Sequence, residues 1–498
     1  MTPAYDSARR DDAMEPCDLS AIEARRLIGL KQLSPVELLK SCVARIEAVN
    51  PAVNAMVAMD TEAARREAEV AEEAVMSGEA LGLLHGLPLG IKDLQVTGGL
   101  TTTFGSLLYK EHVPDEDEDT VANLRDEGAI ILGKTNTPEF GAGANTKNRV
   151  YGATGNPFDT TKTCAGSSGG SAVALALGMV PLASGSDYGG SLRTPAAFTG
   201  VAGFRPSPGL VPGADRAVAL NPFAVQGPMG RSIADLFLLL RAQLDFDRND
   251  PFSFEDTLAF PEHLIENDLA NLTVAVSTNL GCAPIAKSIS ETFAARTDAF
   301  RSVFASADEA YPDFENVHDI FEILRGINFA AAHRERLEQN RDLLGPNVID
   351  NTERGLKFSA SDIAWALAEQ TKLYHRVNAF FDDYDVLICP AAAVSPFPHS
   401  DLSVSEIDGD PMPTYMRWLA ISYAPTTGLC CAAAIPCGVD DAGMPFGIQV
   451  MGRNGSDATV LAIAHALETV LATNDATRRP RPDIAALANA EKLVTQIG

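Results

Sequence analysis

The sequence predicts an α/β fold in which short buried strands alternate with helices. Two observations favour this class. Apolar runs such as residues 273–276 and 385–389 lie between longer segments whose apolar residues recur at helical spacing. Hydrophobic residues make up 46% of the 498-residue chain and charged residues only 21%, which is enough apolar material for a sizeable core. We find neither an internal repeat nor a linker, and we therefore expect a flexible N-terminus over residues 1–20 and a single domain over residues 21–498.

The first two helices carry clear boundary signals. Ser34, Pro35 and Glu37 form a capping-box pattern with proline at the first helical position, and apolar residues follow at helical spacing as far as Asn50. A second helix is expected over residues 61–78, which are rich in Ala and Glu and end at a glycine. Its charge pattern is typical of a solvated face rather than of a binding surface.

Residues 81–230 carry fewer charges and more Gly, Ser, Thr and Pro than the rest of the chain. This composition is typical of short buried elements joined by tight loops that carry function, so we expect the core of the functional site here. The acidic run at 115–119 lies inside this region. We interpret it as a solvated loop, because a site for a hard cation needs spaced oxygen ligands on a shaped loop.

The second half of the chain continues the alternation. A helix is expected to begin after Ser232, residues 245–265 have the composition of a loop, and Ser456 and Asp457 should cap a final long helix. The other expected elements are amphipathic helices at 286–306 and 361–383 and buried strands at 273–276, 385–389 and 446–452. Strands and helices are therefore expected to alternate to the end of the chain, as the α/β class requires.

The net charge excludes several classes of partner. The chain carries 39 Lys and Arg against 66 Asp and Glu, a formal charge of −27. Such a field repels phosphate backbones and anionic lipids, so we expect neither a nucleic-acid nor a membrane partner, and a substrate that is neutral or weakly charged. The first residues lack the apolar region of a secretory signal, and the apolar stretch at 172–183 is too short to cross a bilayer. The sequence thus predicts a cytoplasmic protein.

The eight Cys and eight His residues form no pattern typical of a disulfide framework or a metal site. The sequence contains neither a CxxC pair nor an HExxH motif. We therefore expect no metal and no cofactor.

Residues 128–135, GAIILGKT, match the pattern of a phosphate-binding P-loop, which would make this a nucleotide-binding protein. A P-loop needs a flexible turn rich in free amides, whereas Ala129 to Leu132 are themselves an apolar strand. Pro138 also disfavours a helix directly after the lysine. Nucleotide binding is kept as the alternative from a different functional class.

Residues 166–170, GSSGG, match the GxSxG pattern of a nucleophile elbow with Ser168 at its centre. An α/β-hydrolase would need a strand leading into this motif and an Asp and a His downstream. The preceding residues are polar, and the later His residues lie in unremarkable contexts. We therefore do not expect a Ser-His-Asp triad.

A longer motif is more specific than either of these. Residues 163–196, TCAGSSGGSAVALALGMVPLASGSDYGGSLRTPA, resemble the signature of the amidase signature family of serine hydrolases. The segments at 86–93, 133–148 and 221–240 also resemble family motifs, in the same order, and the likeness covers about residues 20–475. It implies a large mixed central β-sheet covered by helices on both faces, with the signature core at about 81–230, and the hydrolysis of carbonyl C–N bonds without metal or cofactor.

The resemblance assigns a Ser-cisSer-Lys triad: Ser191 as the nucleophile, Ser167 as the serine joined through a cis peptide, and Lys92 as the base. A serine hydroxyl needs a positioned base, and a second hydroxyl can relay a proton because it both donates and accepts. Lys92 can accept the proton only when it is neutral, which requires burial in its apolar strand. Strand alternation should point Asp93 to the opposite face.

The resemblance also assigns an oxyanion hole to the backbone amides of Tyr188, Gly189, Gly190 and Ser191. The family usually has a small or β-branched residue at the place of Tyr188. We expect this ring either in the core or on the wall of an acyl pocket. Asp187 and Arg193 flank the nucleophile and should brace it through a local ion pair.

The resemblance also implies substrate contacts at Gly141, Ala142 and Gly143, beside the scissile group, where missing side chains leave space for a substituent. The Gly- and Pro-rich stretch 206–222 is a candidate wall of the entrance. Trp365, Trp418 and Tyr415 are expected in the core, with an aromatic contribution to the site as the alternative.

These inferences predict a stand-alone amidase, a monomer or homodimer, that acts on a small amide or carbamate. Esterase and urethanase activities are extensions of the same chemistry. The alternative within the family is a glutamine-hydrolysing amidotransferase subunit, which the acidic charge disfavours because its partner is tRNA.

Overall fold

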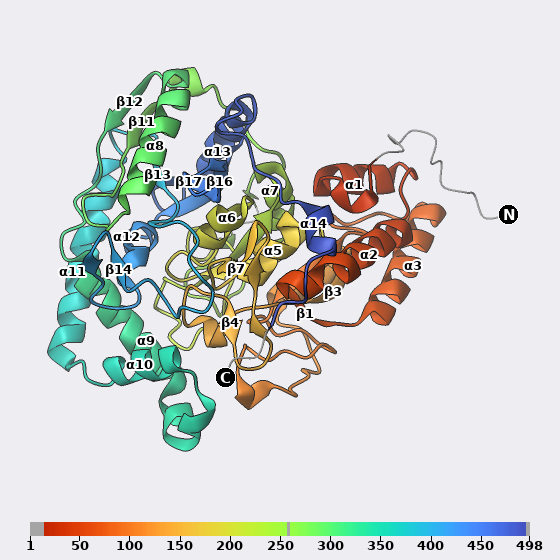
Figure 1. The fold of residues 1–498 in the computed structure, drawn as a ribbon, viewed down its shortest axis with the longest axis horizontal. Helices are drawn as coiled ribbons and strands as arrows, with labels where there is room; N and C mark the ends of the chain where they lie inside the picture. Colours follow the sequence, from red (N-terminus) through yellow and green to blue (C-terminus); the bar gives the residue numbers. More distant parts are fainter. Residues whose placement is uncertain (1–13, 256–258, 495–498) are drawn as a thin grey trace.

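The computed structural model describes residues 14–255 and 259–494, and its centre is an 11-stranded mixed sheet with helices on both sides (Figure 1). The strands follow the order β1-β3-β2-β8-β10-β9-β16-β17-β13-β11-β12. Their bounds are β1 Met56–Met59, β2 Pro88–Lys92, β3 Ile130–Thr135, β8 Leu182–Asp187, β9 Ala202–Arg205, β10 Val225–Gly230, β11 Thr273–Val276, β12 Ser306–Glu309, β13 Val386–Pro390, β16 Cys431–Val439 and β17 Pro445–Gly452.

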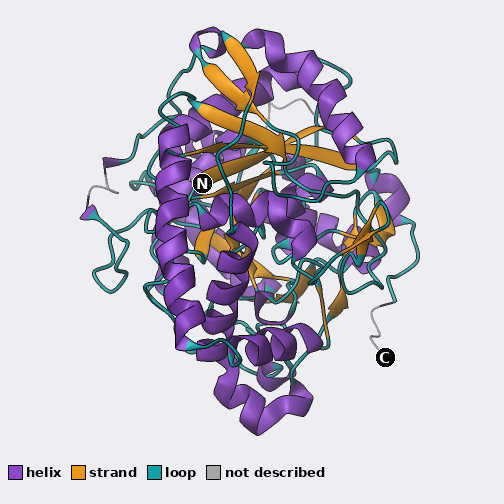
Figure 2. Ribbon diagram, turned by 90° about the vertical axis from the view of Figure 1, so that its left-hand side faces the viewer, coloured by secondary structure: helices purple, strands orange, loops and turns teal. Residues whose placement is uncertain are grey.

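Three short two-stranded ribbons accompany the sheet. They pair β4 Lys147–Asn148 with β5 Gly152–Ala153, β6 Gly155–Asn156 with β7 Asp159–Thr163, and β14 Glu406–Ile407 with β15 Asp410–Pro411. The helices are α1 Ala21–Gly29, α2 Pro35–Val53, α3 Thr61–Ser77, α4 Asp119–Asp126, α5 Gly169–Ala176, α6 Arg193–Thr199, α7 Ile233–Gln243, α8 Lys287–Phe300, α9 Val317–Asn340, α10 Pro346–Gly355, α11 Ala360–Phe380, α12 Ala420–Thr427, α13 Asp457–Ala472 and α14 Ile484–Ala488. Figure 2 shows the strands inside the molecule and the helices around them.

Both faces of the sheet are buried. Along β16, Ala432 and Ala434 belong to one apolar cluster, whereas Cys431 and Ala433 belong to another on the opposite face. Successive side chains of a strand point to opposite faces, so this alternation means that helices cover the sheet on two sides. The predicted fold class, a mixed sheet between two helical layers, is confirmed.

Parallel pairing brings two strand ends together. β2 runs parallel to both β3 and β8, with Leu89 opposite Leu182 and Gly90 opposite Ala183. The carboxyl ends of β2 and β8 therefore lie at the same edge of the sheet. Lys92 is the last residue of β2, and Asp187 is the last residue of β8.

Most predicted elements are present. Ser34 caps α2 with the reciprocal bonds of a capping box, although the helix extends through Pro51 to Val53. The helices predicted at 61–78 and 361–383 and the strands predicted at 273–276, 385–389 and 446–452 are confirmed.

Two predictions about elements are wrong in part. The helix predicted over 286–306 ends at Phe300, and β12 begins at Ser306. Ser456 stands at the N-cap position of α13, but its hydroxyl donates to the Arg453 carbonyl instead of accepting from a helix amide. This helix is the last long one, as predicted, and only the short α14 follows it.

The acidic run at 115–119 is also more structured than predicted. Glu118 accepts hydrogen bonds from the Val96 amide at 2.7 Å and from Gln226 Nε2 at 2.7 Å. Burial raises the pKa of the Glu118 carboxyl, and these donors oppose that shift. Through Glu118 the acidic run therefore anchors the loop that follows β2, and only the rest of the run is solvated.

The predicted flexible segment, residues 1–20, is ordered at its end. Residues 1–13 lie outside the described residues. Pro16–Asp18 form a 3-10 helix with Cys17 buried, and the Cys17 carbonyl accepts from Arg231 Nη1 at 2.9 Å. The last residues of this segment are therefore part of the folded structure.

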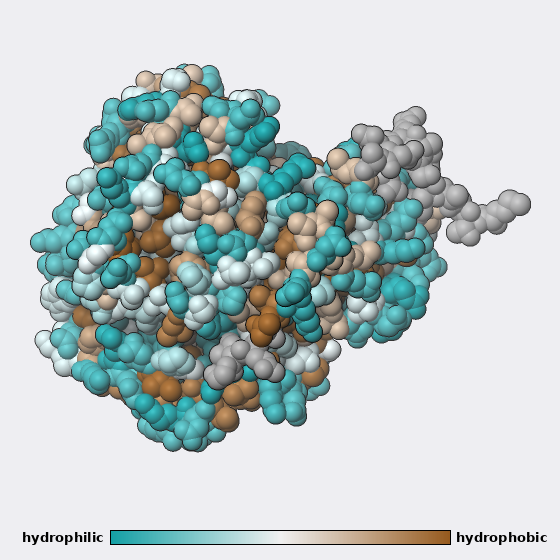
Figure 3. Space-filling model, viewed as in Figure 1, coloured by the Kyte–Doolittle hydropathy of each residue, from teal (hydrophilic) through white to brown (hydrophobic). Residues whose placement is uncertain are grey.

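The surface is predominantly polar. Figure 3 shows mainly hydrophilic side chains on one face, with apolar patches between them. Within residues 14–255 and 259–494, no helix is both long and apolar enough to span a bilayer. In the same part of the chain all eight cysteines are free.

We predict that Gly170→Ala destabilises the protein, although alanine is the better helix former by about 1 kcal/mol. A Cβ at this position of α5 would lie 2.3 Å from the Asn136 amide nitrogen and 2.6 Å from its carbonyl oxygen. Overpacking against rigid backbone should lower the free energy of unfolding by about 2 kcal/mol in urea denaturation. The control is Gly213→Ala, whose Cβ would meet no atom within 4 Å. Equal stabilities of the two variants would contradict this packing.

Candidate active site

Lys92 is a buried lysine held by hydroxyl groups rather than by a carboxylate. Its side chain is 0% exposed. Its Nζ donates to Ser167 Oγ at 2.7 Å, to Ser168 Oγ at 2.8 Å and to Ser186 Oγ at 2.9 Å. Burial lowers the pKa of Lys92 to about 7, although the nearby charge of Asp187 acts in the opposite direction. An amine with this pKa exchanges a proton readily at neutral pH.

The burial of Lys92 follows from the strand that carries it. Every residue of β2 is buried, because the strand pairs with β3 on one side and β8 on the other. The Lys92 amide also donates to Ser184 Oγ on β8 at 3.1 Å. Asp93 points away, as strand alternation predicts, and accepts from the Thr103 amide at 3.0 Å.

Ser167 lies on a turn over residues 164–168, which we call the Ser167 turn. The Gly166–Ser167 peptide bond is cis. The Ser167 side chain is buried, and its carbonyl accepts from Thr137 Oγ1 at 2.9 Å. The Ser167 hydroxyl is thereby directed at Lys92.

Ser191 lies on the turn between β8 and α6, residues 188–192, which we call the Ser191 turn. The residue is half-buried, and its carbonyl accepts from the Ser168 amide at 3.2 Å. This bond joins the Ser191 turn to the Ser167 turn. The structure thus brings Lys92, Ser167 and the Ser191 turn to one edge of the sheet.

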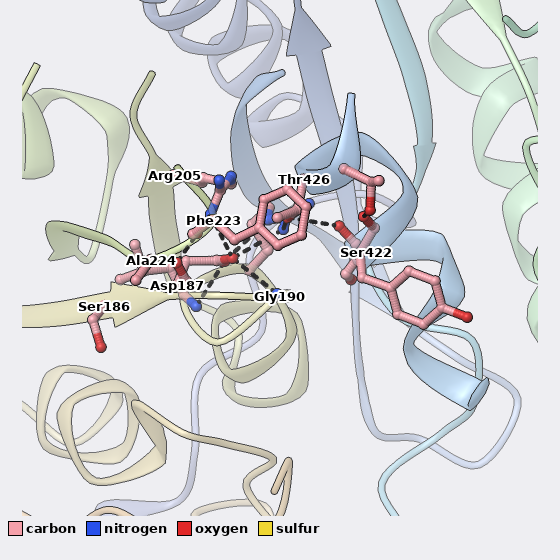
Figure 4. Close-up of polar contacts among 12 residues, drawn as sticks. Ser186, Asp187, Gly190, Arg205, Phe223, Ala224, Ser422 and Thr426 are labelled. Carbon is pink, nitrogen blue, oxygen red and sulfur yellow. Dashed lines mark hydrogen bonds and ion pairs between the residues drawn. The ribbon is translucent and has the colours of Figure 1, made fainter. Parts of the chain in front are cut away.

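Asp187 organises the Ser191 turn. Its carboxylate accepts from the Gly190 amide at 2.9 Å and from the Leu192 amide at 3.1 Å. Arg193 and Arg205 form ion pairs with the same carboxylate at 3.1 and 3.2 Å, and all three side chains are 0% exposed. Figure 4 shows Arg205 and Gly190 directed at Asp187. Burial would raise the pKa of Asp187, but the two guanidinium groups hold it well below its usual range.

The signature motif predicts the Asp187–Arg193 pair but not Arg205. Arg205 comes from β9, which is separated from β8 in the sheet by β10. Its Nη1 also donates to the carbonyls of Asp187 at 2.9 Å and Phe223 at 2.8 Å. Only the folded sheet reveals this partner, because no local motif surrounds it.

The four amides assigned to the oxyanion hole differ in availability. The Gly190 amide already donates to Asp187 at 2.9 Å, so in this structure it is not free to meet an oxyanion. The amides of Tyr188, Gly189 and Ser191 donate to no other group in the described part of the chain. Gly190 has φ +116°, and a Cβ there would lie 2.6 Å from Ser422 Cβ, so this position requires glycine.

The loop of Gly141, Ala142 and Gly143, the glycine loop, lies beside the Ser167 turn at one end only. A Cβ on Gly141 would lie 3.4 Å from Ser167 Oγ, which shows how closely the backbone approaches this hydroxyl. Ala142 is buried, and its carbonyl accepts from Asn347 Nδ2 at 3.0 Å. Gly143 also faces Asn347, because a Cβ there would lie 2.8 Å from the same nitrogen.

One face of α9 connects the glycine loop with the Ser191 turn. It carries four side chains spaced by four residues: Phe321, Arg325, Phe329 and His333. At one end, Phe321 and Arg325 lie 6.0 and 5.4 Å from the centroid of the Tyr188 ring. At the other end, the His333 ring lies 4.7 Å from the ring of Phe140, which precedes the glycine loop. The sequence analysis did not identify α9, whose N-cap residue makes no capping bond.

The predicted aromatic residues differ in position. Trp418 is buried and packs against Phe397 in the core, as predicted, whereas Trp365 is 38% exposed on α11, so its predicted place in the core is wrong. The Tyr415 hydroxyl accepts from Arg325 Nη2 at 2.8 Å, so Tyr415 lies beside this face of α9. Tyr188 is half-buried, and its hydroxyl accepts from Nδ2 of Asn221, at the end of the stretch 206–222, at 3.4 Å.

The two alternative motifs do not form the sites that their patterns suggest. Residues 130–135 are β3, and Lys134 is buried with its Nζ bonded to the Gln95 carbonyl and, at 2.7 Å, to Thr97 Oγ1. The P-loop interpretation is therefore wrong. Ser168 contacts Lys92 and Ser186 rather than a histidine. Over the described residues, no three His, Cys, Asp or Glu side chains cluster as a metal site would require.

Comparison with known proteins agrees with this geometry. The sequence matches the Amidase family over residues 37–461. It is 33% identical to an acylamidase of Rhodococcus erythropolis, across 91% of this chain and 95% of that protein. It is 31% identical to a glutamyl-tRNA(Gln) amidotransferase subunit of Picosynechococcus sp., across 89% of this chain and 96% of that protein. Among solved structures, a bacterial aryl acylamidase of the amidase signature enzymes aligns with a TM-score of 0.84 at 28% identity, across 91% of this chain and 96% of that one.

The chain therefore belongs to the amidase signature family, whose members hydrolyse amide C–N bonds. The family inferred from residues 163–196 is confirmed. The individual roles of Lys92, Ser167 and Ser191 remain predictions. The geometry places Lys92 and Ser167 in direct contact and Ser191 on the neighbouring turn.

We predict that the free energy of unfolding of the wild type rises with pH relative to that of Lys92→Met. The pKa of Lys92 is about 7 in the folded state, against 10.5 for a free lysine, so between these values the unfolded state binds more protons. The wild type should gain about 2 kcal/mol over the variant between pH 7 and pH 9. Urea denaturation at both pH values measures the difference.

The control for this experiment is Lys287→Met, which removes a lysine whose side chain is 81% exposed. Its stability should follow that of the wild type at both pH values. Parallel curves for the wild type and Lys92→Met would contradict a lowered pKa for Lys92.

Proposed function

We propose that this protein is a stand-alone amidase that cleaves acyl amides of aryl or alkyl amines through Ser191, Ser167 and Lys92. What supports the proposal most is the contact of 2.7 Å between the buried Lys92 amine and the Ser167 hydroxyl. A neutral amine there can withdraw a proton through Ser167 from a serine on the neighbouring turn. The likeness to an acylamidase over 91% of the chain supports the same reaction.

The proposed reaction has two stages. Ser191 Oγ attacks the carbonyl carbon while its proton passes through Ser167 to Lys92, and backbone amides of the Ser191 turn stabilise the oxyanion. Ser167 then protonates the leaving nitrogen, and the C–N bond breaks to give an acyl-enzyme. Water enters by the same relay and releases the acid. Protonation of the nitrogen matters because an amine anion is too basic to leave unaided.

The Asp187 network has a clear part in this scheme. Since its carboxylate holds the Gly190 and Leu192 amides, the turn between them is fixed before substrate arrives. The free amides of Gly189 and Ser191 are then available to the oxyanion without reorganisation of the backbone. Asp187 and Arg193 are positioning residues in this proposal, and so is Arg205.

We expect Ser191→Ala to abolish turnover of an acyl 4-nitroanilide, because no other hydroxyl takes the place of the nucleophile. Lys92→Ala and Ser167→Ala should each lower kcat by at least about a thousandfold, since each interrupts the same proton path. Ser168→Ala should retain far more activity than Ser167→Ala, and this pair of adjacent serines is the matched control. Thermal melting would confirm that each variant is folded, and full activity of folded Ser191→Ala would overturn the proposal.

The alternative is glutamine hydrolysis as part of an amidotransferase, which the relative at 31% identity keeps open. A substrate panel with one acyl group and amide, anilide, ester and carbamate leaving groups, together with free glutamine, separates these functions. We expect the anilide and amide to be cleaved, the ester to be cleaved as well, and the small carbamate to react more slowly. Ammonia release from glutamine that exceeds turnover of every other substrate would favour the amidotransferase.

We also propose that the protein acts on small molecules, without a nucleic-acid or membrane partner, as a monomer or homodimer. The formal charge of −27 supports this proposal, because polyanions would be repelled. The polar face in Figure 3 agrees with it.

A further inference from the structure

Arg325 is a buried cation without a carboxylate partner. It is 5% exposed on α9, and no Asp or Glu of the described chain forms an ion pair with it. The other arginines that are as deeply buried, Arg193 and Arg205, both pair with Asp187. An unpaired charge inside a protein is costly, so its presence calls for an explanation.

The guanidinium is held in place by neutral groups. Nε donates to Asn351 Oδ1 at 3.0 Å, and Nη2 donates to the Tyr415 hydroxyl at 2.8 Å. The rings of Tyr188 and Phe329 lie 5.4 and 4.6 Å from its central carbon. These contacts fix the orientation of the group and leave its charge uncompensated.

Part of the guanidinium is free to bind a ligand. Nη1 donates to no group of the described chain, yet it is not among the buried polar atoms that are closed off without a partner. Nη2 uses one of its two N–H bonds on Tyr415. The two terminal nitrogens therefore retain the planar pair of donors that matches a carboxylate.

A second donor belongs to the side chain whose ring the guanidinium contacts. The Tyr188 hydroxyl accepts from Asn221 Nδ2 at 3.4 Å, and its own O–H donates to no group within the described residues. Tyr188 also stands where the resemblance to the family implies a small or β-branched residue. The unusual tyrosine and the unpaired arginine are thus in contact with each other.

The position of these donors indicates which part of a substrate they would meet. In the proposed function, on which this inference rests, Ser167 protonates the leaving amine, and Gly141 is the neighbour of Ser167. Tyr188 belongs instead to the Ser191 turn, which holds the carbonyl. The Arg325 region therefore lies on the acyl side.

We propose that Arg325 and the Tyr188 hydroxyl form a subsite for a carboxylate at the far end of the acyl group. The preferred substrates are then monoamides of dicarboxylic acids, in place of the neutral molecules that the net charge suggested. The acidic surface does not prevent this binding, because salt screens it beyond about 8 Å at physiological ionic strength, whereas the buried guanidinium acts at contact.

The test compares mono-4-nitroanilides of succinic, glutaric and adipic acid with their methyl esters, which remove the charge and add only a methyl group. For at least one chain length, the wild type should show a kcat/KM at least about tenfold higher for the free acid. Arg325→Gln should lower this ratio by about ten- to a hundredfold, because it removes the charge that only the free acid meets. Tyr188→Phe should lower the ratio by a smaller factor.

Arg376→Gln is the matched control, because it makes the same change on α11, where the arginine pairs with Asp313 at 3.2 Å. Its acid-to-ester ratio should equal that of the wild type. The subsite is overturned if the wild type prefers no free acid of any length, or if Arg325→Gln lowers kcat/KM equally for acid and ester. Should Arg325→Gln fail to fold, glutarate must inhibit ester turnover by the wild type at least tenfold more strongly than pentanoate, and equal inhibition overturns the subsite.

These outcomes are separate from a failure of the proposed function. If the function itself is wrong, the wild type turns over neither the acids nor the esters. If only the subsite is wrong, the wild type cleaves the esters and shows no preference that depends on Arg325.

Discussion

The exclusion of water from the Lys92 amine is the constraint on which the rest of the site depends. Parallel pairing of β2 with β3 and β8 places this side chain at a buried strand end, and three serine hydroxyls replace its hydration shell. Hydroxyls solvate an amine without fixing a proton on it, whereas a carboxylate would hold the ammonium form. The low pKa of this amine, which is the base in the proposed function, is therefore a consequence of the sheet topology.

The same sheet edge separates two opposite electrostatic tasks. Lys92 is surrounded by neutral groups, while Asp187, at the end of β8, carries a full charge shared by Arg193 and Arg205. The charged network fixes the backbone of the turn, and in the proposed function the neutral network moves protons. Because two arginines balance Asp187, its field shifts the pKa of Lys92 upward less than burial shifts it downward.

Sequence reasoning was most successful where information is local. The capping box at Ser34, the apolar strand before Lys92 and the signature around Ser167 each depend on neighbouring residues, and each is found in the structure. The family motif predicted more of the site residues than hydrophobic periodicity did, because glycines and serines alone are ambiguous turn residues.

What sequence reasoning missed depends on contacts between distant segments. Arg205 reaches Asp187 only through the strand order β8-β10-β9, and Glu118 is buried only because Gln226 and the Val96 amide meet it. α9 lacks a capping signal and mixes charged with apolar residues, so Arg325 did not stand out among the other arginines. The Gly190 amide looked free in the motif, and only the geometry of Asp187 shows that it is used.

The most direct test of the central claim is an NMR titration of the Lys92 side chain in the intact protein. Labelling lysines with ¹³C at Cε, with Lys92→Met to assign the signal, reports the protonation state of this amine without relying on activity. The account predicts a midpoint near the pKa of about 7 that burial gives Lys92. A midpoint at the ordinary value for lysine, about 10.4, would show that the amine stays charged at neutral pH and would contradict its role as a base.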